Sequence, residues 1–132
     1  MNDLWAEDIA TEKVRTPVAI LREQASLLGK KTQNVVLAEV VTSAGSRFHH
    51  RFNITAPALG DYSYTLFSIN HPIGPYPLEV DLDDDIAKEL GKSIDRNMTI
   101  ENEADFINLL NQILKAERTK HIIRILLAQS SE

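Results

Sequence analysis

Histidine and carboxylate side chains are the residues of this chain best suited to acid–base chemistry. His49 and His50 are adjacent in the sequence. Neighbouring residues of a strand point to opposite faces, so these two cannot chelate one metal ion. His49 or His71 beside a carboxylate such as Glu79 or Asp81 is the pairing that would support small-molecule binding or hydrolysis. No HExxH, GxSxG or paired-acid motif accompanies these residues.

The acidic run at residues 81–85 resembles the start of a calcium-binding loop. Asp81, Asp83 and Asp85 match its first, third and fifth positions, but the glycine required next is Ile86 and the closing acid is Lys92. Acids in a first helical turn are favoured by the helix dipole, so the run predicts a solvated helix start. The chain has no cysteine, and we expect neither a metal ion nor another cofactor.

A polar surface on two predicted strands is the main candidate for binding. In the segment 47–55, aromatic and aliphatic side chains alternate with polar ones, which is typical of a half-buried strand. The polar side of this segment is expected to lie beside strand 62–69 on a sheet face that no helix covers, with Phe67 adding an exposed aromatic ring. The predicted binding residues are Arg47, His49, Arg51, Thr65 and Phe67. The alternative is an ordinary wet sheet face.

Charge is distributed unevenly along the chain. The formal net charge is −5, and residues 61–114 hold eleven acids against three lysines or arginines. Binding nucleic acid needs a basic surface that neutralises phosphates, so we expect no nucleic-acid partner. A basic protein would complement the acidic segment, and a homodimer is another form of partner that the exposed aromatic would support.

Periodicity and capping residues define the expected elements. Thr16-Pro17 is a helix start, with a hydroxyl cap followed by proline at the first helical position, and Asn102 caps a second helix. The final apolar segment 120–129 would also suit a strand, and we interpret it as a helix. The expected elements are helices at 17–28, 83–90, after 102 and at 120–129, strands at 34–42, 47–55, 62–69 and 76–82, a short helix within 3–13, and a connector at 92–101.

Short turns between successive strands predict an antiparallel meander, because parallel neighbours would need long crossovers. The fold class is therefore α+β: a four-stranded antiparallel meander sheet, with an N-terminal helix and C-terminal helices packed on one face. Pro77 places the fourth strand at an edge. At 132 residues we expect one domain, 1–132, with residues 1–15 as a loose N-terminal segment.

The sequence favours a binding protein over an enzyme. The first residues are acidic, unlike a signal peptide, and no window is apolar enough to span a membrane, so a cytoplasmic location without membrane contact is expected. We therefore expect a non-enzymatic interaction module, such as an adaptor, a dedicated chaperone or a neutralising partner. The alternative is the small-molecule-binding or hydrolytic domain described above.

Overall fold

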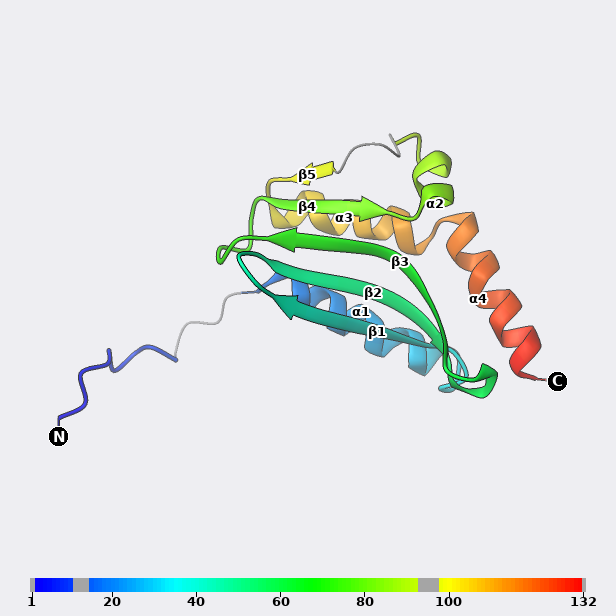
Figure 1. Ribbon diagram of the computed structural model, residues 1–132, viewed down its shortest axis with the longest axis horizontal. Helices are drawn as coiled ribbons and strands as arrows, with labels where there is room; N and C mark the ends of the chain where they lie inside the picture. The colour runs from blue at the N-terminus through cyan, green and yellow to red at the C-terminus, as the bar shows by residue number, and fades with distance from the viewer. Residues whose placement is uncertain (1, 11–14, 93–97, 132) are drawn as a thin grey trace.

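The computed structural model describes residues 2–10, 15–92 and 98–131 (Figure 1). The first helix, α1 (Pro17–Lys31), begins as predicted, with the Thr16 hydroxyl accepting a hydrogen bond from the Ala19 amide at 3.3 Å. Residues 7–10 form only a turn, so the helix expected within 3–13 is wrong over this part, and residues 11–14 lie outside the described residues. Polar and charged residues interrupt the apolar positions there, and a helix that short is unstable in water.

The sheet is an antiparallel meander in which sequence order and spatial order coincide. Its strands are β1 (Leu37–Ala44), β2 (Phe48–Ala56), β3 (Tyr62–His71), β4 (Leu78–Leu82) and β5 (Met98–Ile100), and a 3-10 turn, η1 (Pro57–Leu59), joins β2 to β3. The predicted architecture is confirmed, but the strand number was wrong by one. The segment expected as a connector contains β5, which pairs with β4 from Leu78 opposite Ile100 to Val80 opposite Met98. Three residues are too few to show alternation in a sequence.

Strand β4 is not an edge strand, contrary to the prediction from Pro77. It pairs with β3 on one side and β5 on the other. Pro77 lies just before the strand begins at Leu78, so its missing N–H removes no hydrogen bond between the strands.

Three further helices follow the fourth strand. They are α2 (Asp84–Glu89), α3 (Glu103–Leu114) and α4 (Glu117–Ser130). Asp83 caps α2 by accepting a hydrogen bond from the Ile86 amide at 3.2 Å, and Asn102 caps α3 through the Asp105 amide at 2.9 Å. The helical interpretation of the last segment is confirmed. The helix-start interpretation of the acidic run is confirmed from Asp83 onward, whereas Asp81 belongs to strand β4.

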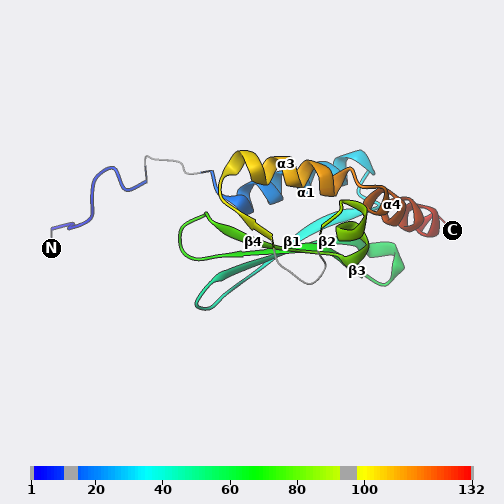
Figure 2. The ribbon, with the colours of Figure 1, turned by 90° about the horizontal axis from the view of Figure 1, so that it is seen from above.

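Helices α1, α3 and α4 all lie on one side of the sheet (Figure 2). The core lies between these layers, and its largest fully buried side chains include Phe52, Phe67 and Phe106. No helix of the described residues lies on the opposite side of the sheet (Figure 2), and we call this side the open sheet face. In the described part of the chain, no helix is long and apolar enough to cross a membrane.

Phe67 lies in the core and not on the open sheet face, so the prediction of an exposed ring was wrong. The pairing of β2 with β3 shifts between Phe52 and Asn53, so that Leu66 is an extra residue, a β-bulge. Beyond the bulge the alternation of β3 is reversed. Phe67 is 1% exposed, and its ring stacks on that of Phe52 with centroids 5.2 Å apart.

Candidate functional site

The open sheet face holds four of the five residues predicted to bind a partner. His49 and Arg51 are exposed there, on strand β2. Arg47 lies just before β2 and donates from Nε to the side-chain oxygen of Asn70 at 2.7 Å. Thr65 donates its hydroxyl proton to Asn53 at 2.7 Å. Two of the four are thus engaged within the sheet, and the surface is polar without the apolar centre expected from Phe67.

The predicted histidine–carboxylate pair is not assembled. Strand β3 separates β2 from β4, so His49 faces Asn70, and Asn70 in turn faces Glu79. Two strand spacings are about 10 Å, well beyond hydrogen-bond distance. Asp81 belongs to the neighbouring row, opposite Ser68, and His71 shares the helix-covered face with Phe48. The geometry gives the hydrolytic alternative no support.

His50 and His71 form a buried hydrogen-bonded chain instead. The Nδ1 atom of His71 lies 2.6 Å from the Pro72 carbonyl oxygen and 3.2 Å from that of Gly74, so it must be a donor. In the neutral pair, the Nε2 atom of His71 then accepts from that of His50, 3.2 Å away, and the Thr42 hydroxyl donates to His50 Nδ1 at 2.9 Å. Burial, and then the neighbouring His71, lower the pKa of His50 to about 4.

This histidine pair is structural by its contacts. The ring of Phe48 stacks on His71 with centroids 5.7 Å apart, and both histidines are buried. Within residues 2–10, 15–92 and 98–131, no three His, Asp, Glu or Cys side chains lie close enough to hold a metal ion. All four ring nitrogens of the pair therefore have hydrogen-bond partners inside the fold.

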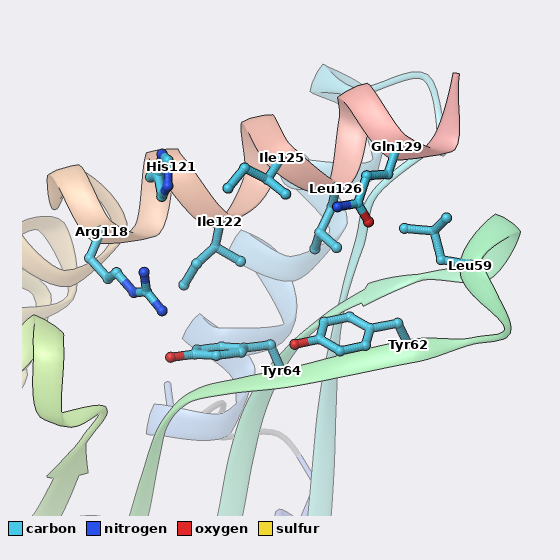
Figure 3. Close-up of a pocket in the computed structure, with 9 residues that line it drawn as sticks. All are labelled: Leu59, Tyr62, Tyr64, Arg118, His121, Ile122, Ile125, Leu126 and Gln129. Carbon is cyan, nitrogen blue, oxygen red and sulfur yellow. The ribbon is translucent and has the colours of Figure 1, made fainter. Parts of the chain in front are cut away.

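A concave surface lies between α4 and the first half of β3. This α4 groove has a volume of about 460 Å³ and is lined by Leu59, Tyr62, Tyr64, Arg118, His121, Ile122, Ile125, Leu126 and Gln129. Figure 3 shows the α4 side chains along one wall, the two tyrosine rings along the other and Leu59 at one end. Its volume falls within the range of about 300–1,000 Å³ typical of ligand sites.

Two large apolar side chains on opposite walls of the α4 groove are half exposed. Tyr62 on β3 is 45% exposed and Ile125 on α4 is 41% exposed. Both line the same cavity, with the buried side chains of Ile122 and Leu126 behind them. A facing pair of this kind gains free energy when an apolar partner excludes water from between its members.

A carboxylate from α2 holds the start of α4 in place. The residue before α4, Ala116, offers no side-chain cap. Glu89 supplies one from α2, accepting hydrogen bonds from the Glu117 amide at 2.7 Å and the Arg118 amide at 2.9 Å. An acid at this position satisfies two otherwise unpaired N–H groups and complements the helix dipole. Part of the acidic segment thus works inside the fold by positioning one wall of the groove.

Arg118 and Tyr64 form the polar end of the α4 groove. The guanidinium carbon lies 5.9 Å from the centre of the Tyr64 ring, within cation–π range. Tyr64 donates its hydroxyl proton to Asp83 at 2.5 Å. Burial, and then this hydrogen bond, raise the pKa of Tyr64, so the hydroxyl remains a donor. The Nε atom of Arg118 lies 3.5 Å from an Asp85 oxygen but makes no hydrogen bond with any described residue.

Sequence reasoning missed the α4 groove because its walls are far apart in the chain. Tyr62 was assigned to the strand at 62–69 and His121 to the helix at 120–129, without any link between the two segments. One local signal was present: Ile125 follows Arg124 within a helix whose apolar positions already form a buried stripe, leaving Ile125 outside it. Such a residue marks a second apolar face.

Comparisons with known protein families, with curated proteins and with solved structures found no match to this chain. The roles of its residues are therefore argued from geometry and chemistry.

Proposed function

We propose that this chain is a non-enzymatic protein-binding module and that the α4 groove is its binding site. The observation that carries the proposal is the pair of half-exposed apolar side chains, Tyr62 and Ile125, facing one cavity from two elements. Tyrosine and arginine are the residue types most enriched where binding energy is concentrated in protein interfaces, and this groove combines two tyrosines with Arg118.

The lining of the groove suits recognition better than catalysis. It contains no carboxylate, serine or cysteine, and its histidine, His121, is exposed on α4. General acid–base or nucleophilic chemistry needs a base held in place beside a nucleophile or a second titratable group. An apolar cavity with one cation at its end instead fits a side chain or short segment of another protein.

The charge around the groove favours an acidic, amphipathic partner segment. Helix α4 carries Arg118, Lys120 and Arg124 against Glu117, and the groove lining adds no acid. The acidic segment suggested a basic partner, but Asp83, Asp85 and Glu89 of that segment contact Tyr64, Arg118 and the start of α4. A partner with aromatic or aliphatic residues and flanking carboxylates matches the groove better.

The open sheet face is the weaker surface in this proposal. Arg47, His49, Arg51 and Thr65 remain candidate contacts there, as expected from the sequence, but without Phe67 the apolar anchor is missing.

The cysteine-free composition fits a reducing compartment, and we propose a cytoplasmic location on that ground.

A labelled peptide tests the proposal. Fluorescence anisotropy with a short synthetic peptide of tryptophan and leucine flanked by glutamates should show saturable binding to the full chain. Ile125→Asp should weaken this binding at least tenfold, because it places a carboxylate against the apolar and acidic ligand. Ile73→Asp is the matched control, since Ile73 is highly exposed and outside the groove. Equal binding to both variants, or none to the wild type, would contradict the proposal.

A further inference from the structure

The N-terminal segment of residues 2–10, which we call the arm, exposes three large apolar side chains. Leu4 is 90% exposed, Trp5 75% and Ile9 64%. Both ribbon views show the arm extending away from the sheet and helices (Figures 1 and 2). Large apolar side chains gathered on one short exposed segment are typical of an interaction site.

The arm has the chemistry that the α4 groove would select. Asp3, Glu7 and Asp8 lie among its apolar side chains, and residues 2–10 contain no lysine or arginine. Helix α4 carries the opposite charge, with Arg118 at the end of the groove and Arg124 further along the helix. Carboxylates close to arginine on a partly desolvated surface make the stronger class of hydrogen bond. The acidic arm and the arginines of α4 are therefore opposite in charge, and both the arm and the groove present apolar side chains.

The lengths of the two features also match. Arg118 and Gln129 mark the groove along α4, and eleven helical steps span about 17 Å. Leu4 and Ile9 are five residues apart, which in an extended chain is also about 17 Å. When the turn at residues 7–10 opens into an extended chain, the arm places Trp5 in the cavity while its ends reach both ends of the groove.

The positions of the arm and the groove favour exchange between two copies. The arm leads into the start of α1, whereas η1, with Leu59 of the groove, lies at the end of the sheet where α1 finishes (Figure 1). The arm points away from its own groove. A two-fold axis relating two antiparallel copies would bring each arm to the groove of the other and close the assembly.

We infer that the arm of one copy, through Leu4, Trp5 and Ile9, binds in the α4 groove of a second copy, forming a reciprocal arm-exchanged dimer. This inference rests on the proposed function of the groove and names its occupant. Two short arms bury an area at the low end for specific interfaces, a class that includes weak and transient complexes. We expect a weak dimer with a dissociation constant in the micromolar range. A second ligand of the same chemistry would compete with the arm.

The single tryptophan of the chain gives a direct test. In full-length protein diluted from about 500 µM to about 1 µM, a range that brackets a weak dimer, Trp5 emission should move to longer wavelength. Light scattering should show the mass falling from dimer to monomer. Ile125→Asp should emit at long wavelength throughout, with circular dichroism confirming its fold.

A mixing experiment separates exchange from the alternatives. Trp5→Ser has an intact groove and no tryptophan, so adding it in excess to Ile125→Asp should move the emission of the latter to shorter wavelength, as its arm enters the intact groove. The double variant W5S/I125D is the matched control and should cause no change. Emission that stays at short wavelength while light scattering shows a monomer would indicate docking within one copy and would overturn exchange.

Emission that stays at long wavelength at every concentration would also overturn the inference. The proposed function would then be judged separately by the synthetic acidic peptide. If that peptide binds and Ile125→Asp weakens it, the groove is a binding site whose occupant is another protein. If it does not bind, the proposed function fails together with the exchange.

Discussion

Acidification should destabilise this protein through His50, whose pKa is lowered in the fold. The pKa falls from an ordinary value of 6.5 to about 4 because the imidazole is buried, with His71 adding to the effect. Between these two values the unfolded chain binds a proton that the folded chain does not. The contribution of neutral His50 to the free energy of unfolding is therefore fully present above about pH 6.5. It falls as the pH decreases and is lost below about pH 4.

The magnitude follows from the pKa difference of about 2.5, which corresponds to at most about 3.4 kcal/mol. Between pH 7 and pH 4.5 the linkage relation gives a loss of about 2 kcal/mol from this one group. Urea unfolding at both pH values measures it, and the wild type must be compared with His50→Gln because other groups also titrate in this range.

His49→Gln is the matched control for this comparison. It makes the same substitution one residue away, on the opposite and exposed face of β2. The free energy of unfolding should fall about 2 kcal/mol less in His50→Gln than in the wild type over this pH interval, whereas His49→Gln should follow the wild type. An identical pH dependence in His50→Gln and the wild type would contradict a lowered pKa of the buried His50.

Two further substitutions test the packing that supports the groove. Glu89→Ala should lower the free energy of unfolding by about 1–2 kcal/mol, because it removes the cap of α4. The control is Glu23→Ala, which removes an exposed acid on α1. Equal losses of the two variants in urea unfolding would argue against the cap. Phe67→Ala should cost about 3–5 kcal/mol because the side chain is fully buried. The partly exposed Phe48 should cost clearly less when replaced by alanine, and a small loss at Phe67 would contradict the bulge.

Local sequence patterns sufficed for the elements whose signals lie within a few residues. The caps at Thr16 and Asn102 and the alternation through β2 were all found in the structure. They depend on neighbouring residues, and the physics of capping and of strand alternation acts over the same short range. The order of the sheet was predictable as well, because short turns leave antiparallel pairing as the remaining choice.

The reversal within β3 was the costliest error, since it moved Phe67 from the open sheet face into the core. Alternation predicts which sheet face a side chain occupies only while successive residues of the strand point to opposite faces. A bulge adds one residue to one strand and so reverses the faces beyond it. The pair Leu66-Phe67 was a local sign, because two adjacent large apolar residues cannot both face the helices in a regular strand.

The α4 groove could not be derived from the sequence, because it depends on how distant segments meet. Glu89 caps a helix that begins 28 residues later, and Tyr62 and Ile125 line one cavity although more than sixty residues separate them in the sequence. No periodic pattern encodes such contacts. Ile125, which lies outside the buried stripe of α4, indicates only that this helix has a second apolar surface.

A residue-resolved titration would show directly whether the α4 groove binds an acidic apolar segment. Amide chemical shifts of ¹⁵N-labelled Trp5→Ser, in which the arm lacks its largest apolar side chain and competes less, would be followed as the acidic tryptophan peptide is added. If the α4 groove is the binding site, saturable shifts are expected at Leu59, Tyr62 and Tyr64 and along α4 from Arg118 to Gln129. Shifts confined to His49 and Arg51 on the open sheet face, or no saturable shifts, would contradict binding in the α4 groove.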